Sequence, residues 1–496
     1  MVTSRSLPRL TLSRGLGLVA GLAAFALLGG LDGPLHHDPA YGSRPAYAAA
    51  GAALMAIWWL TEAIPIYWTA CLPFVVFPLF GVFGDGVGTS GKALASAYLD
   101  PYIFLFAGGM AIAAAMQQWN LHRRIALSIM KVIGSEPKRL LAGSLCATAF
   151  ISLWISNTAT ATMMVPIGIA LIAQLEAHQG GRRLASFGMA IMLSIAYGAN
   201  IGGIGTKIGT APNAQFAGFL ERMGTEVSFL QFLAVGLPFV LLFLPLAWWA
   251  LWRMGREDAP ADASASDVVA RELAELGPVQ PAEKLILCVF GLAAAGWIGG
   301  RFLTSALKPW VTAFPLTSAH VEGGVAMLAA FVLLALRCRG RAVLAPRSLT
   351  TVPWETLLLL GGGFALAAAV QASGLSAWLS GALGGLRSFP GFTQVLLASL
   401  AAVGLSAVAS NTATVAVLLV VLKDAVSPDQ LHTVLFAVTI AASCDFALPA
   451  GTPPNAIVFG SGYVTIPRMA RTGFVLDLQA ALLAALWCAL VVPLVL

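Results

Sequence analysis

The sequence Ser156-Asn157-Thr158-Ala159-Thr160 recurs unchanged as Ser410-Asn411-Thr412-Ala413-Thr414 in the second half of the chain. Upstream, at the same spacing, Gly108-Gly109 corresponds to Gly362-Gly363. Downstream, a Gly-Thr-x-Pro-Asn-Ala sequence follows each copy, at 209–214 and at 451–456. The order of these features is the same in both halves. The chain therefore contains an internal repeat with a short polar segment at its centre.

Long apolar stretches surround the repeated pentapeptide. Of the 496 residues, 58% are hydrophobic and only 10% are charged, which is more apolar surface than a soluble protein of this size can bury. Stretches such as 15–31, 227–252 and 473–496 are long enough to cross a hydrocarbon core of roughly 30 Å as helices. The composition predicts an all-α polytopic membrane protein with about 11 transmembrane helices.

The two stretches that contain the pentapeptides, 140–175 and 392–422, differ from the others. Each is long enough for two half-helices and has polar residues in its middle, as in a re-entrant hairpin that enters and leaves on one side. With the N-terminus in the cytoplasm and both hairpins re-entrant, roughly 20 of the 28 basic residues lie inside, as the positive-inside rule expects. The hairpins then open to opposite sides, which predicts two inverted-topology repeats in an inner (plasma) membrane.

The first apolar run follows Arg5, Arg9 and Arg14, as in a signal peptide. The run 15–31 is long for the hydrophobic region of a signal peptide, and no clean small-x-small cleavage site follows it directly. We therefore expect a retained first transmembrane helix. Residues 253–283 are the one clearly soluble stretch, and they predict a cytoplasmic linker with a short helix around 268–276.

Each pentapeptide combines oxygen ligands with hydrogen-bond donors. Ser, Asn and Thr at a hairpin tip present hydroxyl, amide and main-chain oxygens, which suit Na⁺, and the start of the following half-helix favours an anion such as a carboxylate. The glycines and prolines of 200–212 and 443–455 interrupt two further helices, whose free carbonyls can complete a cation shell. Inverted repeats with broken helices are typical of secondary transporters. The alternatives are polar side chains that only hold helices together and kinks that only serve packing.

Two charged residues lie in these otherwise uncharged breaks, Lys207 in the first and Asp445 in the second. Charges inside a membrane are costly and are usually paired or functional. Three interpretations are open: Lys207 pairs with Asp445, it replaces part of a sodium ion's charge beside the anion, or it reaches to the membrane interface. The second interpretation would suit a sodium-independent exchanger.

Other classes of function fit the sequence less well. The net charge of +6 comes with no basic stripe interleaved with aromatic residues, so no nucleic-acid partner is expected. No His-Glu-x-x-His sequence supports a membrane-embedded enzyme, and the six cysteines lack metal-ligand spacing. A channel needs a continuous polar path, whereas these motifs form local sites. We predict a protein that is not an enzyme and has no cofactor, with Na⁺ as its coupling ion.

The sequence resembles the divalent anion/sodium symporter family, which includes citrate, succinate and sulfate carriers. The resemblance covers nearly the whole chain and rests on the paired pentapeptides, on Trp58-Trp59-Leu60-Thr61-Glu62-Ala63-Ile64-Pro65 and on 443–458. It implies a homodimer that works by an elevator mechanism, in which a transport domain slides against a scaffold. The scaffold spans would be 1–135 and 284–385, the two parts of the transport domain 136–252 and 386–496, and the linker 253–283.

The resemblance also implies a site, residue by residue. The sodium ligands would be Ser152, Ser156, Asn157 and Gly209 in the first half and Ser406, Ala409, Ser410, Asn411 and Gly451 in the second. The substrate would contact Asn157, Thr158, Thr210, Asn411, Thr412, Thr452 and Pro453. Paired Asn-Thr donors without a dedicated arginine suit a C4-dicarboxylate such as succinate, malate or fumarate, carried with Na⁺. Sodium-independent exchange and citrate or sulfate symport stay open as alternatives.

Overall fold

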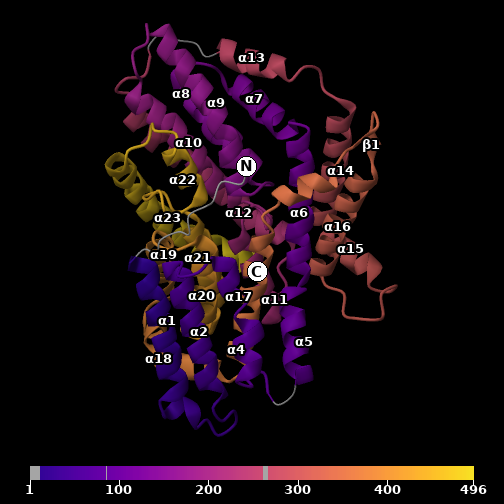
Figure 1. Cartoon of the computed structure of the whole chain (residues 1–496), viewed down its shortest axis with the longest axis vertical. Coiled ribbons are helices and arrows are strands. Elements are labelled where there is room, and N and C mark those ends of the chain that lie inside the picture. The colour runs from indigo at the N-terminus through magenta and orange to yellow at the C-terminus, as the bar shows by residue number, and fades with distance from the viewer. Residues whose placement is uncertain (1–11, 85–86, 261–265) are drawn as a thin grey trace, which may run out of the picture.

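The computed structural model describes residues 12–84, 87–260 and 266–496, and helices make up almost all of this part (Figure 1). Arg5 and Arg9, which the N-terminal prediction used, lie outside the described residues. Before the first hairpin the chain forms α1 (Leu12–Gly30), α2 (Arg44–Thr61), α3 (Ile66–Thr69), α4 (Pro73–Leu79), α5 (Val87–Tyr98), α6 (Pro101–Gln118) and α7 (Leu121–Ile133), with a 3-10 turn at Pro34–His36.

Two of these regions differ from expectation. The apolar stretch 66–84 does not form one span but the short helices α3 and α4, where Pro73 begins α4 and Pro78 lies inside it. Proline lacks the N–H donor that a longer helix would need at these places. The helix α5 is not among the predicted segments, because its sequence is rich in Gly, Ser and Thr and only weakly apolar.

Two helical hairpins and two helix breaks lie at the predicted positions, and whether the hairpins are re-entrant stays a prediction. The first hairpin consists of α8 (Pro137–Ser152) and α9 (Asn157–His178), and the second of α19 (Gly391–Ser406) and α20 (Asn411–Leu422). After each hairpin a helix is interrupted at the Gly-Thr-x-Pro-Asn sequence. The interrupted pairs are α10 (Ala185–Gly203) with α11 (Ala211–Arg222), and α21 (Leu431–Ser443) with α22 (Pro453–Phe459). A long helix closes each half, α12 (Phe229–Gly255) and α23 (Ile466–Val495).

The region between the first broken helix and the second hairpin completes the fold. In the predicted linker, α13 (Ser266–Glu275) lies close to the helix expected at 268–276. The following helices are α14 (Pro281–Ile298), α15 (Gly300–Leu307), α16 (Ser318–Ala335), α17 (Trp354–Ala372) and α18 (Leu375–Leu383). Short 3-10 turns lie at Pro346–Thr351, Gly384–Ser388 and Pro428–Gln430. A two-stranded hairpin, β1 (Arg337–Cys338) with β2 (Arg341–Ala342), is a small departure from the all-α prediction. Arg339 and Gly340 have positive φ angles of 50° and 79°, as a two-residue hairpin turn requires.

The two halves interlock around the helix breaks. α10 packs on α8, α9 and α12, and α21 packs in the same way on α19, α20 and α23. After each break the chain contacts the other half, because α11 packs on α20 and α22 packs on α9. In Figure 1, α8 and α9 lie in the upper part of the molecule and α20 lies in the lower part. This arrangement agrees with two hairpins that approach a common centre from opposite ends.

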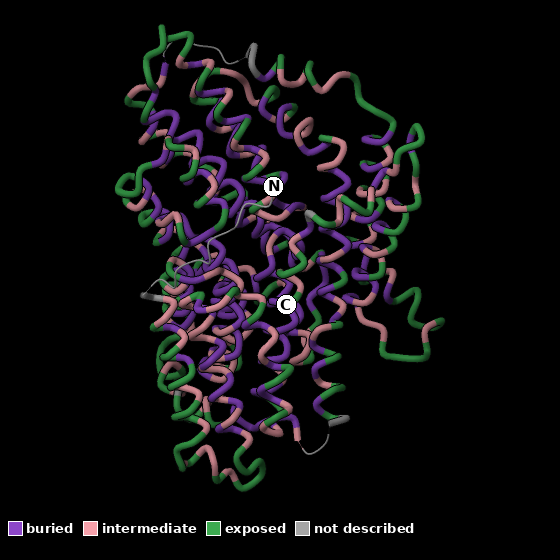
Figure 2. Tube along the Cα trace, in the orientation of Figure 1, coloured by how far each residue is buried: buried purple, intermediate pink, exposed green. Residues whose placement is uncertain are grey.

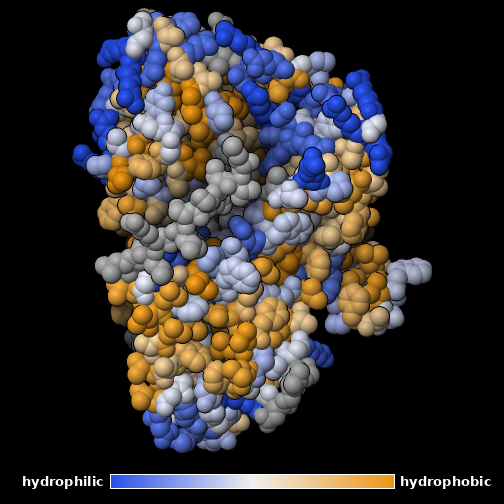
Figure 3. Space-filling view, viewed as in Figure 1, coloured by the Kyte–Doolittle hydropathy of each residue, from blue (hydrophilic) through white to orange (hydrophobic). Residues whose placement is uncertain are grey.

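The helix lengths and the surface are those of a multi-pass membrane protein. Within the described residues, 8 helices are long and apolar enough to cross a membrane. The predicted total of about 11 also counts shorter apolar segments such as Ile66–Leu79. Hydrophobic residues cover much of the middle and lower surface, and hydrophilic residues gather towards both ends (Figure 3). Exposed residues lie along the rim of a buried interior (Figure 2), and apolar side chains such as Leu292 and Leu490 are among them, as a lipid-facing surface requires.

Candidate functional site

The tip of the first hairpin, where α8 ends and α9 begins, forms one side of the site. The Ser152 hydroxyl hydrogen-bonds to Oδ1 of Asn157 at 2.8 Å and to the main-chain carbonyl of Ala199 on α10 at 2.7 Å. These bonds hold the Asn157 amide at the first turn of α9. A helix start carries N–H groups without helical partners and a partial positive charge, both of which favour an anion.

The tip of the second hairpin repeats this geometry. The Ser406 hydroxyl hydrogen-bonds to Oδ1 of Asn411 at 2.8 Å and to the carbonyl of Ala442 on α21 at 2.6 Å. One detail differs. The Ser410 hydroxyl accepts a hydrogen bond from the N–H of Ala413 at 3.2 Å and so caps α20, whereas the equivalent serine of the first hairpin makes no cap bond. In both hairpins the serine that ends the first arm orients the asparagine that begins the second.

Asn213 and Asn455, the asparagines of the two Gly-Thr-x-Pro-Asn sequences, hold the helix breaks in shape. Nδ2 of Asn213 donates to the main-chain carbonyls of Gly203 at 2.8 Å and Thr206 at 2.7 Å. Nδ2 of Asn455 donates to the two equivalent carbonyls of the second break, at 3.1 and 3.0 Å. Because buried carbonyls outside a helix need partners, these amides stabilise an unwound backbone. The sequence marked these asparagines as part of a motif but did not assign them this role.

The two tips and the two breaks meet at one cavity of about 900 Å³. The helices α9, α11, α20 and α22 all begin at its wall. We call 156–158 with 209–210 the first half-site, and 410–412 with 451–453 the second. The predicted site residues that line the cavity are Ser156, Asn157, Thr158, Gly209, Thr210, Ser410, Asn411, Thr412, Gly451, Thr452 and Pro453. Residues from both halves of the chain therefore form one site.

Three predicted ligands lie behind the cavity wall. Ser152 and Ser406 are fully buried and reach the site only through their asparagines, and Ala409 is buried beside Ser410. The last residues of the pentapeptides, Thr160 and Thr414, are also buried and do not line the cavity. The first three positions of both pentapeptides therefore line the cavity, whereas the last position is buried behind it.

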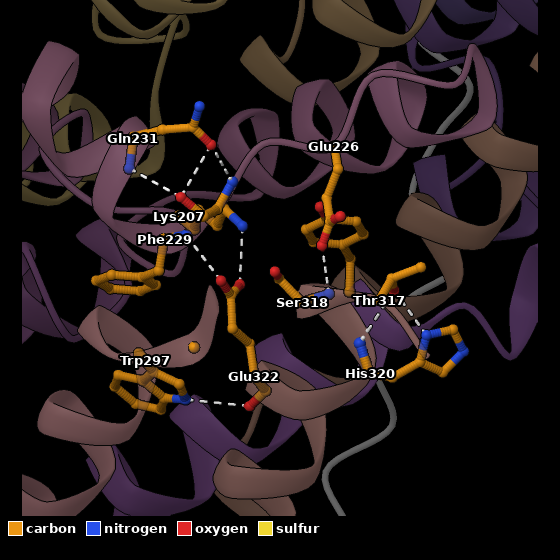
Figure 4. Close-up of polar contacts among 12 residues, drawn as sticks. Lys207, Glu226, Phe229, Gln231, Trp297, Thr317, Ser318, His320 and Glu322 are labelled. Atoms are coloured by element: carbon orange, nitrogen blue, oxygen red, sulfur yellow. Dashed lines mark hydrogen bonds and ion pairs between the residues drawn. The ribbon is translucent and has the colours of Figure 1, made fainter. Parts of the chain in front are cut away.

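The predicted pairing of Lys207 with Asp445 is wrong. Nζ of Lys207 lies 2.8 Å from Oε2 of Glu322 on α16 (Figure 4) and 5.1 Å from the centre of the Tyr102 ring. Both side chains of the ion pair are completely buried, so Lys207 does not reach the membrane interface either. Lys207 is also absent from the cavity wall, and Glu322 neutralises its charge. The interpretation that Lys207 stands in for a sodium ion beside the anion therefore loses its basis.

Glu322 is a central residue that the sequence reasoning missed. Its Oε1 accepts a hydrogen bond from the N–H of Phe229, the first residue of α12, at 2.7 Å. Its main-chain carbonyl accepts one from Nε1 of Trp297 on α14 at 3.1 Å (Figure 4). Glu322 thereby connects α16 to the first helix break, to α12 and to α14. One signal was available, because an acidic residue within an apolar span requires a partner.

Asp445 is fully buried beside Gly451, a residue of the cavity wall. Neither of its carboxylate oxygens has a hydrogen-bond partner within the described residues. A second buried carboxylate lies close by, since Oδ1 of Asp477 on α23 accepts the N–H of Phe446 at 2.9 Å. The second break therefore contains two buried carboxyl groups, and neither forms an ion pair with a lysine or arginine among the described residues.

The cavity wall contains further polar residues that the sequence did not single out. Nδ2 of Asn200, on α10, donates to the main-chain carbonyl of Asp445 at 3.0 Å and to Oγ1 of Thr452 at 3.1 Å, which joins the first half to the second break. Arg14 on α1 also lines the cavity, 3.9 Å from the carboxylate of Glu62. Contrary to expectation, the wall does contain an arginine, although a carboxylate accompanies it.

Comparisons with known proteins identify the family of this chain. The sodium:sulfate symporter transmembrane region, as a family model, matches residues 42–495. The sodium-dependent dicarboxylate transporter SdcS of Staphylococcus aureus, in strains bovine RF122 and USA300, is 35% identical over 454 residues, which cover 89% of this chain and 85% of the relative. Among solved structures, the YdaH transporter of Alcanivorax borkumensis has a TM-score of 0.55 and 15% identity over 97% of this chain and 98% of that chain, which shows a shared fold. The family and these relatives are transporters and not enzymes. The chain belongs to the sodium:sulfate symporter family, the divalent anion/sodium symporters that its sequence resembles.

Proposed function

We propose that this protein carries small dicarboxylates across the membrane together with Na⁺. One observation carries the proposal: two half-sites of matching geometry face a single cavity, and each joins neutral oxygen atoms to the start of a helix. Two equivalent anion-binding helix starts suit a substrate with two carboxylates. The relative SdcS is named as a sodium-dependent dicarboxylate transporter, which supports both the substrate class and the ion.

The chemistry of each half-site separates the two charges. The amide nitrogen of Asn157 or Asn411, the neighbouring threonine hydroxyl and the free N–H groups of the helix start can donate to a carboxylate. The Asn Oδ1 atom and the free carbonyls near Gly209 or Gly451 can accept a cation. Na⁺ bound behind each tip would offset the charge of the carboxylate in front of it. A C4-dicarboxylate such as succinate fits two carboxylate positions in one cavity of this size.

Uptake of labelled succinate into proteoliposomes tests the proposal. We expect uptake driven by an inward Na⁺ gradient to exceed uptake in K⁺ at least about tenfold, because bound Na⁺ offsets the dianion. Excess unlabelled malate or fumarate should compete, and sulfate should compete weakly. Empty liposomes and liposomes preloaded with succinate in Na⁺-free buffer are the controls.

The outcomes separate this function from its alternatives. Uptake that needs internal succinate and ignores Na⁺ would establish the sodium-independent exchanger instead. Strong uptake of citrate or sulfate that succinate does not inhibit would show that the substrate is citrate or sulfate and not a C4-dicarboxylate. Ohmic conductance without saturation or counterflow would indicate a channel.

We further propose that transport uses an elevator motion of 136–252 with 386–496 against 1–135 with 284–385. The division is supported by the packing, since each broken helix packs on its own hairpin and its second part packs on the other hairpin, forming one interlocked unit. The cavity wall includes residues of both proposed domains, such as Thr162 on α9 and Thr356 on α17. The homodimer and the cytoplasmic N-terminus stay predictions.

Labelling from each side of the membrane tests the elevator. In a variant without native cysteines, we expect Thr162→Cys to react with an impermeant thiol reagent from either side, depending on Na⁺ and succinate, because the transport domain carries it across. Thr356→Cys lines the same cavity from the scaffold and should react from one side only. If both cysteines change sides together, a rocking motion replaces the elevator. If Thr162→Cys reacts from one side under every condition, the elevator model is wrong.

A further inference from the structure

The two half-sites differ at one pair of equivalent positions. In the first half, Gly209 lies so close to Gly203 that a Cβ atom on Gly209 would collide with the Gly203 carbonyl. In the second half, Gly451 lies in the same way against Asp445, and a Cβ atom on Gly451 would collide with its carboxylate. The main-chain carbonyls of Gly203 and Asp445 are also the equivalent acceptors of the asparagine amides in the two breaks. The first half-site thus has a glycine where the second has a carboxylate.

The glycine position indicates where this carboxylate points. A Cβ atom on Gly203 would collide with Oδ1 of Asn157, the amide oxygen of the first half-site. A side chain at this position is therefore directed at the oxygen atoms of its own half-site. In the second half-site the equivalent space holds the side chain of Asp445, next to Gly451. The Asp445 carboxylate therefore lies against the backbone of Gly451, a residue of the second half-site.

The carboxyl group of Asp445 has no partner in the part of the chain that the structure describes. Asp445 is completely buried, and neither carboxylate oxygen has a hydrogen-bond partner within the described residues. The one buried lysine of the first break is already paired with Glu322. Asp477 is a second buried carboxyl group nearby. Oδ1 of Asn200, whose amide nitrogen donates to the Asp445 carbonyl, is a further buried acceptor without a hydrogen-bond partner among the described residues. A buried carboxylate is stable in its ionised form only with a positive partner, and a cation bound among these acceptors would supply that partner.

We infer that the Asp445 carboxylate is a direct ligand of the cation in the second half-site. The two half-sites are then unequal: the first holds its cation with neutral oxygen atoms alone, and the second holds its cation with a formal negative charge. This inference rests on the proposed Na⁺-coupled function and deepens it. It assigns Na⁺ affinity mainly to the second half-site, because an ionised ligand binds a hard cation more strongly than a carbonyl does.

The Na⁺ dependence of succinate uptake by Asp445→Asn tests the inference. The substitution keeps the shape of the side chain and removes its charge. We expect the half-saturating Na⁺ concentration to rise about tenfold or more, while uptake at saturating Na⁺ stays within a few fold of wild type. Na⁺-dependent thermal stabilisation of the purified protein without succinate should weaken in parallel. Asp445→Gly is a second variant, which places at this position the residue that the first half-site already accommodates.

Asp477→Asn is the matched control, because it removes a neighbouring buried carboxylate that already has a main-chain partner. Its half-saturating Na⁺ concentration should stay within about twofold of wild type. If the half-saturating Na⁺ concentration rises equally in Asp445→Asn and Asp477→Asn, Asp445 acts only through its general negative potential. Its role as a direct ligand is then wrong. An unchanged Na⁺ response in both Asp445 variants would do the same. Na⁺-independent uptake by the wild type would instead contradict the proposed function itself.

Discussion

Replacing either Asn157 or Asn411 by alanine is expected to abolish succinate uptake and to leave the protein folded. In the proposed site each amide belongs to a sodium shell and to a substrate contact, so two ligands lose a partner at once. Hydrogen bonds to charged groups contribute about 1.5–3 kcal/mol each, which corresponds to a loss of transport of roughly 100-fold or more. The hairpin should persist, because the serine behind each asparagine keeps its bond to a main-chain carbonyl of α10 or α21.

Thr414→Val is the matched control for these variants. Thr414 lies in the same pentapeptide as Asn411, but it is buried and does not line the cavity, and its hydroxyl has no partner within the described residues. Its valine variant should transport within about twofold of wild type. Proteoliposome uptake and size-exclusion chromatography of all three variants give the measurement. Normal transport by either asparagine variant would contradict a site built from both motifs.

Replacing Lys207 by methionine is expected to destabilise the protein by about 3–5 kcal/mol, because it leaves Glu322 buried without its partner. The double variant Lys207→Met/Glu322→Met should regain much of this stability, since two apolar side chains of similar volume can replace a buried ion pair. The recovery should be incomplete, because Glu322 also accepts the N–H of Phe229. Unfolding in mixed detergent micelles, followed by tryptophan fluorescence, measures the free energies.

The ion pair between Arg139 and Glu136 is the control for this prediction. Its side chains are 63% and 71% exposed, whereas those of Lys207 and Glu322 are both 0% exposed. Arg139→Ala should therefore change stability by less than about 1 kcal/mol. If Lys207→Met is no more destabilising than Arg139→Ala, the buried pair does not hold the first break in place. The double variant should also retain Na⁺-dependent uptake, and a switch to Na⁺-independent exchange would restore a role for Lys207 in ion choice.

Lys207 and Glu322 also bear on the proposed elevator. Lys207 lies in the first part of the proposed transport domain, and Glu322 lies on α16 in the proposed scaffold. A sliding transport domain would have to open this pair in each cycle, since a buried contact cannot follow a movement of its partner. Under the proposed elevator, the pair would stabilise the conformation described here relative to one in which the domains have moved.

Most of the fold followed from patterns that depend on the local sequence. Long apolar runs require helices in a membrane because every backbone group must find a partner within the chain. The polar centres of 140–175 and 392–422 and the Gly-Pro clusters after them marked the hairpins and the breaks, and the structure has both. The helix α5 was missed because its glycines, serines and threonines carry no membrane signal. The division of 66–84 was missed because the effect of Pro73 and Pro78 depends on what packs around them.

The candidate site could be predicted only in part from the sequence. The residues that were not predicted are those whose role depends on contacts between distant parts of the chain. Duplication of the pentapeptide identified the asparagines and threonines of the cavity without any structure. It did not reveal that Asn213 and Asn455 hold the unwound backbone, because an amide's partners depend on the path of the chain. It also did not reveal the contribution of Asn200, which acts on the opposite half.

The repeated Ser-Asn-Thr segments and the hydrophobic pattern by themselves determined that this chain is a membrane protein with two similar half-sites, because both signals lie within short windows of sequence. Only the tertiary structure decided how the charges inside the membrane are arranged. Lys207 and Asp445 occupy comparable breaks, and the sequence suggested that they pair. In the structure Lys207 binds Glu322, and the Asp445 carboxyl lies beside Gly451 of the second half-site without a hydrogen-bond partner in the described chain. The reason is physical: the energy of a buried charge depends on the atoms within a few ångströms, and folding brings those atoms from distant parts of the chain.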